Sequence, residues 1–424
     1  MTIRIKKPRQ HSKPEWLIIF MLVMPFLISF LTELLPFPSA VKYTIDLGWL
    51  LLVLFMVRSG MRLPSRYSQH LLFVVLAFFA FTVVGFLLGY QSVLYYVWGF
   101  RNNARFFVFF FACILFLNSE SVEPLLQLMD TLFVINFFIT LYQFFILDIS
   151  QDYLGGIFGV ESGCNGYTNI FLVIVITRSI LRYLNYAEST KSCLMKCAMA
   201  LLITALAELK IFLVEFVLIV FLAMLVTKHS QRKLLLICAA CIGLVLSMQL
   251  LVTVFPYWAG KLNVAEMWEE IASDEGYTDA GDLNRMTAVP DAMAMFLHTL
   301  PQKLFGLGLG NCDTSSFSFL NTPFYEENSW LHYSWFSSSF LVLETGLVGL
   351  VLYVLFFLLI FFAVRNLEHS GKGHMEYCQL ASILSLICLV LIIYNISLRT
   401  EAGYMMFFML ALPFIKDASN DGHL

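Results

Sequence analysis

Residues 256–335 read PYWAGKLNVAEMWEEIASDEGYTDAGDLNRMTAVPDAMAMFLHTLPQKLFGLGLGNCDTSSFSFLNTPFYEENSWLHYSW and form the one long polar interval of the sequence. The rest of the 424-residue chain is a series of apolar runs joined by short connections. The composition is 59% hydrophobic and 13% charged, with a mean hydropathy of +0.80. A soluble domain carries about twice that share of charge. The sequence therefore predicts a membrane protein with one long segment outside the bilayer.

The apolar runs are long and uniformly apolar, which is typical of membrane-spanning helices. A β-barrel would instead show segments of roughly ten residues in which apolar and polar residues alternate. We predict an all-α polytopic protein with about twelve spans, at residues 16–36, 43–57, 71–90, 104–117, 131–149, 166–184, 197–209, 211–227, 234–255, 338–364, 376–397 and 402–415.

The distribution of Lys and Arg predicts the topology. With the N-terminus inside, 18 of them fall on the inner side and 8 on the outer side, so the positive-inside rule places both termini in the cytoplasm. The chain then divides into a bundle of about nine spans at 1–255, a long extracytoplasmic loop with surface helices at 256–337, and a bundle of about three spans at 338–424. This topology requires that 197–209 and 211–227 be two separate helices.

Several cations lie on the outer side, against this bias. Arg101 and Arg105 are four residues apart, so on a helix they share one face. They either reach lipid phosphates or form a fork that binds an anion bidentately. Lys210 begins an apolar run, where it either pairs with Glu208 or Glu215 to hold a turn or faces a cavity.

The long loop begins with an acidic run that predicts a solvated helix face and a turn: Glu266, Glu269, Glu270, Asp274, Glu275, Asp279 and Asp282. Arg285 follows as the single arginine of the loop, ahead of a segment that predicts a surface helix. Gly306, Gly308 and Gly310 form a G-x-G-x-G pattern, which implies no nucleotide fold without a preceding strand.

Four other positions are candidates for a structural or functional role. Asn165, in a glycine-rich outer loop, is a candidate N-cap of the next helix. Cys164 and Cys312 fall on the same side of the membrane and form a candidate disulfide. Glu344 lies about two turns into the tenth span, where it either holds a loop or tunes a proton donor.

Five mouth-facing cations come from separate points in the chain and together predict a basic pocket within the bilayer: Arg101, Arg105, Lys210, Arg285 and Arg399. A diphosphate with a lipid tail fits such a pocket, and fixed cations would stabilise the diphosphate as it departs in a transfer reaction. The attacking hydroxyl needs a base. His332 is the first candidate by titration range, followed by Glu326 or Glu327.

Four segments follow one another in the chain: IFGVESGCNGYTNIFL, AELKIFLVEF, NRMTAVPDAMAMFLHTLPQKLFGLGLGN and SFLVLETGLVGLVLYVLF. In their nature and order, over roughly residues 95–365, the chain resembles the O-antigen polymerase and O-antigen ligase (Wzy/WaaL) family of bacterial membrane glycosyltransferases. In the second segment the basic residue is Lys210, where the family commonly has Arg. The ligases typically carry a His-Asn pair before the glutamate segment, and the corresponding residues here are Trp335 and Phe336. The resemblance therefore favours the polymerase.

The resemblance implies a GT-C-like enzyme in the bacterial inner membrane, with its long loop in the periplasm. Lys210 and Arg285 are then expected to bind the undecaprenyl diphosphate of a lipid-linked oligosaccharide, in an inverting transfer without metal or cofactor. Arg101, Arg105 and Arg399 would add to that site, with His332, Arg285 and Glu344 as catalytic residues. Expected partners are the bilayer, a flippase and a chain-length regulator, and no nucleic acid.

Two alternatives to the polymerase stay open. One is an O-antigen ligase that transfers polymer to lipid A-core. The other is a flippase or transporter for lipid-linked glycan, although such proteins tend to show two similar halves, whereas these spans divide nine and three around the long loop.

Overall fold

A computed structural model describes residues 12–35, 37–89, 91–228, 230–259, 281–315 and 317–416. Within these ranges the chain is helical, and the one β-bridge joins Asn118 and Lys416. The predicted all-α class is confirmed. The acidic residues from Glu266 to Asp279, together with Lys261, lie outside the described residues.

Fifteen α-helices are used in the description below. They are α1 (Lys13–Ser29), α2 (Thr44–Arg58), α3 (Arg66–Leu88), α4 (Val93–Phe116), α5 (Ser119–Phe145), α6 (Asn165–Leu184), α7 (Thr190–Leu206), α8 (Lys210–Val226), α9 (Arg232–Val254), α11 (Ala288–Phe296), α12 (Leu300–Phe305), α13 (Pro323–Asn328), α14 (Ser337–His369), α15 (Met375–Tyr394) and α16 (Gly403–Ala411). Four short turns also matter: η2 (Ser39–Tyr43), η7 (Ser329–Leu331), η8 (Tyr333–Trp335) and η9 (Ser397–Arg399).

Nine helical segments in the described part of the chain are long and apolar enough to cross a membrane. They comprise α1 with the π-helical turn after it, α2 with the turn before it, α3, α4, α5, α6, α9, α14 and α15. The other three predicted spans overlap α7, α8 and α16, which have 17, 17 and 9 residues and are not among these nine. A 17-residue helix rises about 26 Å, close to the thickness of a bilayer core.

The runs 197–209 and 211–227 form two separate helices, as predicted. The chain leaves α7 after Leu206 and begins α8 at Lys210. Glu208 lies between them in the left-handed region, at φ 53°. This tight turn separates the two helices within a few residues.

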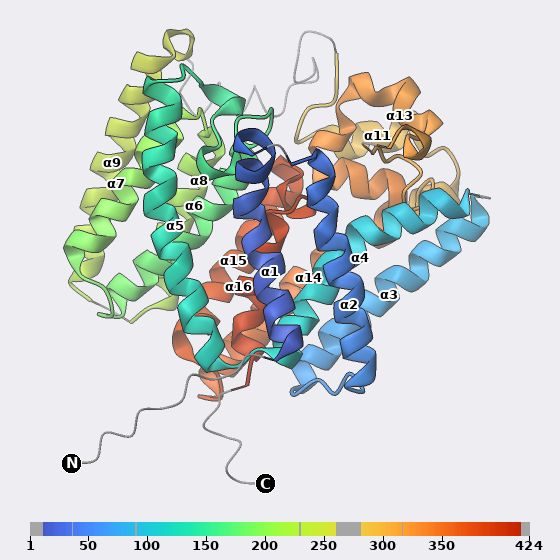
Figure 1. Cartoon of the computed structure of the whole chain (residues 1–424), viewed down its shortest axis with the longest axis horizontal. Helices are drawn as coiled ribbons and strands as arrows, with labels where there is room; N and C mark the ends of the chain where they lie inside the picture. Colours follow the sequence, from blue (N-terminus) through green and yellow to red (C-terminus); the bar gives the residue numbers. More distant parts are fainter. Residues whose placement is uncertain are drawn as a thin grey trace.

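The helices surround a central group. Figure 1 shows α5, α7 and α9 on one side of the bundle, α1, α15 and α16 near its centre, and α2, α3 and α4 on the other side. In the same view α11 and α13 lie at one end of the bundle, above α3 and α4. The predicted surface helix is α11, which packs against α14. Leu283, Ala292 and Tyr333 belong to a small apolar cluster that joins these loop helices to the start of α14.

Helix α14 is broken at Gly346, whose φ of 64° and ψ of −170° are not helical. The break frees backbone carbonyls that must find other donors, because unsatisfied groups are costly inside a membrane. Two such donors come from residues 304–310, the glycine-rich segment of the long loop. Leu307 N donates to Leu343 O at 2.7 Å, and Gly308 N donates to Glu344 O at 3.2 Å. A segment of the long loop therefore completes a helix of the bundle.

Gly310 brings the same segment against α4. Its φ is +83°, and its backbone lies so close to α4 that an added Cβ would overlap the carbonyl oxygen of Tyr95 and come within 2.8 Å of the Gly99 nitrogen. The G-x-G-x-G pattern thus permits the chain to pass between α4 and α14. Its role in this fold is close backbone packing.

We predict that Gly310→Ala lowers the stability of the protein more than Gly371→Ala does. Gly371 also has a positive φ, +64°, but nothing lies within 4 Å of an added Cβ. Gly371→Ala should cost about 1–2 kcal/mol from the left-handed backbone alone, whereas Gly310→Ala adds about 1–3 kcal/mol of overpacking. Thermal unfolding in detergent, followed by size-exclusion fluorescence, measures both. Equal shifts in the two variants would contradict this packing.

Candidate functional site

A polar cavity of about 400 Å³ lies where the loop meets the bundle. Its wall combines η2, α4, the segment that follows the glycine-rich turn, Ser334 of η8, the start of α14, and η9 with Glu401. Two of the predicted cations line it, Arg101 and Arg399. The cavity therefore collects residues from the first, middle and last parts of the chain.

Arg101 forms a bidentate ion pair inside the protein. Its Nε donates to Asp46 Oδ1 at 2.8 Å and its Nη2 donates to Asp46 Oδ2 at 2.5 Å. The guanidinium carbon also lies 4.8 Å from the centroid of the Trp98 ring. The bidentate partner of Arg101 is therefore a carboxylate of α2, and binding of an external anion by Arg101 stays a prediction.

Arg105 holds the segment that carries Arg399. Its Nη1 donates to Glu401 Oε1 at 3.0 Å, and its Nη2 donates to the Arg399 carbonyl at 3.0 Å. Glu401 also accepts a bond of 2.6 Å from the Tyr167 hydroxyl. Burial by itself would raise the pKa of the Glu401 carboxyl, but Arg105 and Tyr167 stabilise its ionised form and bring the pKa to about 2. This ion pair therefore stays charged at any physiological pH.

Arg399 is the buried cation of the cavity wall, with 6% of its side chain exposed. Its Nη2 lies 3.7 Å from Glu344 Oε2, and its guanidinium carbon lies 3.8 Å from the centroid of the Phe340 ring. Within the part of the chain that the structure describes, its Nε and Nη1 have no hydrogen-bond partner. Buried donors left without acceptors cost about 1–3 kcal/mol each, so this position suits a ligand that brings acceptor oxygens.

The other two predicted cations do not line this cavity. The Arg285 guanidinium lies 4.4 Å from the Tyr394 ring centroid, at the end of α15. The Lys210 ammonium lies 3.5 Å from the Trp258 ring centroid, and Figure 1 places α8, which begins at Lys210, on the other side of the central helices from α11. Arg285 is therefore close to the η9 side of the cavity, because Tyr394 comes just before the cavity-lining Ile396.

The two acidic neighbours of Lys210 have other partners. The Glu208 carboxylate accepts bonds from the Tyr257 hydroxyl at 2.5 Å and from Trp258 Nε1 at 2.9 Å. Glu215 is buried in α8 and accepts a bond of 2.9 Å from Asn169 Nδ2. Glu208 therefore fixes the Trp258 ring, against which Lys210 lies.

His332 pairs with a residue that sequence reasoning had placed on a solvated face. Its Nδ1 lies 2.6 Å from Asp282 Oδ2, and the Asp282 side chain is fully buried, whereas 29% of the His332 side chain is exposed. The imidazole also stacks on Trp335, with ring centroids 3.8 Å apart and planes 13° apart. The expectation that Asp282 is solvated is wrong.

Glu344 holds the glycine-rich segment in place through a hydrogen bond. Its Oε1 accepts a bond of 2.9 Å from the Gly310 nitrogen, and its other oxygen faces Arg399. This geometry gives it the loop-holding role of the two that the sequence allowed. A catalytic role for Glu344 stays a prediction.

Two expectations in the outer loops are corrected. Cys164 is the N-cap residue of α6, and Asn165 instead donates to Asp152 Oδ1 at 2.7 Å. Cys164 and Cys312 are free thiols. The Cys164 sulfur donates to the Gly159 carbonyl at 3.3 Å, and Cys312 is buried in the apolar cluster of the loop helices.

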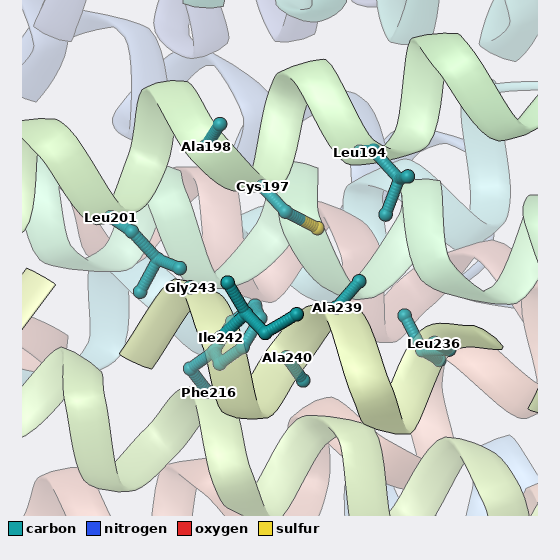
Figure 2. A pocket seen from close by; sticks show the side chains of 10 residues that line it. All are labelled: Leu194, Cys197, Ala198, Leu201, Phe216, Leu236, Ala239, Ala240, Ile242 and Gly243. Atoms are coloured by element: carbon teal, nitrogen blue, oxygen red, sulfur yellow. The ribbon is translucent and has the colours of Figure 1, made fainter. Parts of the chain in front are cut away.

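A second cavity, of about 270 Å³, lies between α7, α8 and α9. Figure 2 shows its lining, in which the Cys197 thiol and apolar side chains such as Phe216 and Leu236 surround the space beside Gly243. No charged side chain lines it. The polar cavity is therefore the candidate functional site.

Comparison with known protein families finds no matching family, and no curated protein matches the chain. Among the described residues, no group of three or more His, Cys, Asp and Glu side chains is placed to hold a metal ion.

Glu344→Gln and Glu344→Ala separate the two roles of this residue. Gln keeps an acceptor for the Gly310 nitrogen but not the charge that faces Arg399, so we expect Glu344→Gln to lose less stability than Glu344→Ala. Glu344→Ala leaves that buried N–H unsatisfied and should cost about 1–3 kcal/mol. Unfolding temperature in detergent is the measurement, with catalytic turnover read on the same preparations. A stable Glu344→Gln protein with turnover reduced by about 100-fold or more would instead mark Glu344 as an acid or base.

Proposed function

We propose that the chain is a glycosyltransferase that polymerises lipid-linked glycan repeat units at the outer face of a bacterial inner membrane. The observation that supports this proposal is Arg399, a buried guanidinium that lines the polar cavity. Its Nε and Nη1 have no hydrogen-bond partner among the described residues. A diphosphate supplies charge and acceptor oxygens in the arrangement that guanidinium recognises. Its lipid tail would remain in the bilayer.

With the diphosphate bound at Arg399, the proposed reaction is a glycosyl transfer. An oxygen of the acceptor sugar attacks the anomeric carbon of the donor glycan, and the bond between that carbon and the diphosphate oxygen breaks. The bonding electrons leave with the undecaprenyl diphosphate, where negative charge grows. A fixed cation such as Arg399 stabilises that charge more in the transition state than in the ground state. The hydroxyl proton passes to a base, for which His332 is the candidate.

The remaining predicted residues take different parts in this proposal. Arg101 lines the cavity but is paired with Asp46, and Arg105 orients the Arg399 segment through its carbonyl. We assign Arg101 to substrate contact and Arg105 to positioning. Arg285, near the η9 side of the cavity, is proposed to bind the same diphosphate. Lys210 stays a prediction that comes from the family resemblance.

One observation favours the transporter alternative. Transporters often bind their substrates at discontinuous helices, and α14 is discontinuous at Gly346. In this chain, however, the break is filled by residues 304–310, whose backbone bonds its freed carbonyls. A filled break favours a fixed enzyme site over a transport pathway.

Arg399→Ala tests the diphosphate site. We expect polymer formation to fall by about 10²–10³-fold, the loss typical of removing one donor to a developing anion, with Arg399→Lys intermediate because it keeps the charge but not the fork. The measurement is product length on a gel after purified protein in nanodiscs is incubated with a lipid-diphosphate oligosaccharide. Lys303→Ala, an exposed cation of α12 outside the cavity, is the matched control. Unchanged product in Arg399→Ala would refute this site.

Glycan profiles of cells lacking the protein discriminate the alternatives. Loss of a polymerase leaves single repeat units, loss of a ligase leaves polymer on its lipid carrier, and loss of a flippase leaves neither outside. We expect single repeat units.

Transfer in the purified system should also persist in EDTA, and inhibition by EDTA would argue for a metal ion in the reaction.

A further inference from the structure

The geometry points to Asp282 and Trp335 as positioning residues that prepare His332 to act as a base, an inference that rests on the proposed function. Asp282 lies 50 positions before His332 in the chain, and the two side chains meet at 2.6 Å. The carboxylate is fully buried, while the imidazole is partly exposed. A substrate can therefore reach the imidazole while the carboxylate stays behind it.

The direction of this hydrogen bond determines which nitrogen can take a proton. An ionised carboxylate only accepts hydrogen bonds, so with Asp282 ionised the proton of this contact lies on His332 Nδ1. In the neutral ring, Nε2 then carries the lone pair. Asp282 thus selects the tautomer whose Nε2 is basic.

Backbone contacts hold the same unit. His332 has a φ of 52°, in the left-handed region between η7 and η8, a conformation that residues with a side chain adopt at an energetic cost. Such conformations persist where surrounding contacts enforce them, and they cluster at functional sites. Here Leu283 N donates to Leu331 O at 3.1 Å, which ties the Asp282 segment to η7.

Trp335 fixes the plane of the imidazole ring. Its backbone nitrogen donates to the His332 carbonyl at 2.9 Å, and the two rings stack nearly parallel at 3.8 Å. The ring of His332 is therefore constrained at one edge by Asp282 and on one face by Trp335. Ser334, between them in sequence, lines the polar cavity, which places the unit beside the proposed substrate site.

In the proposed reaction the acceptor hydroxyl gives its proton to His332 Nε2 as its oxygen bonds to the anomeric carbon. The carbon–oxygen bond to the diphosphate breaks at the same centre, and its electrons leave with the diphosphate. The imidazolium that forms carries a positive charge next to the buried Asp282 carboxylate, which stabilises it. Asp282 itself neither gains nor loses a proton.

Asp282→Asn is the main test. The amide has the shape of the carboxylate but can also donate to Nδ1, which favours the wrong tautomer, so kcat should fall by about 10²–10⁴-fold while KM for the lipid-linked donor changes less than about threefold. If Asp282 and His332 act as one unit, the double variant Asp282→Asn/His332→Ala should be no slower than His332→Ala alone. Additive losses, or a change in KM alone, would show a structural role and overturn the inference.

Two further measurements keep the test decisive. Histidine ¹⁵N NMR of the wild-type protein, with the His332 signal assigned by comparison with His332→Gln, should show the neutral ring protonated at Nδ1. A proton on Nε2 overturns the inference even if Asp282→Asn fails to fold. Failure of the proposed function is a separate result, because wild-type protein would then make no product from the lipid-diphosphate donor. Wild-type activity that Asp282→Asn fully retains rejects the positioning role alone.

Discussion

The carbonyl groups released where α14 breaks at Gly346 are the constraint from which the site follows. Inside a bilayer such groups need donors from the protein, and Leu307 and Gly308 of the long loop provide them. This pairing places the glycine-rich segment of the loop, residues 304–310, between α4 and α14. It also places the Gly310 nitrogen on Glu344, whose other carboxylate oxygen faces Arg399. The break in one helix thereby fixes part of the polar cavity beside it.

Charge balance is the second property of this region. Three arginines at or beside the cavity each face a carboxylate, in the pairs Arg101–Asp46, Arg105–Glu401 and Arg399–Glu344. A broadly basic pocket, as the outer cations suggested, would attract anions mainly through its net charge. Paired guanidinium groups instead hold their donors in fixed directions, so recognition depends on geometry. Among the three, the widest ion-pair separation, 3.7 Å, belongs to Arg399, which is why the anion is assigned there.

The sequence predicted the helices because an apolar run of membrane length is a local signal. Even the separation of α7 from α8 followed from residue order and the charge bias, although the turn lies at Glu208, two residues before the predicted break. The contacts of the site were not local. Asp282 meets His332 across 50 positions and Asp46 meets Arg101 across 55, and no spacing rule links such residues. Asp46 did carry a signal that was overlooked, because a carboxylate at the start of an apolar run is costly without a partner.

The first half of α14 connects the two chemical groups of the proposed reaction. This half-helix begins at Ser337, whose backbone nitrogen and hydroxyl both donate to the Asn395 carbonyl, at 3.1 and 2.8 Å. Arg399 lies against its Phe340, and the His332 imidazole stacks on Trp335, two residues before it begins. The proposed cation for the diphosphate and the proposed base for the hydroxyl therefore both lie against the start of one anchored helix. In the proposed reaction such an arrangement would hold the two groups in place before substrate binds, which is the condition under which fixed charges and bases accelerate a transfer most.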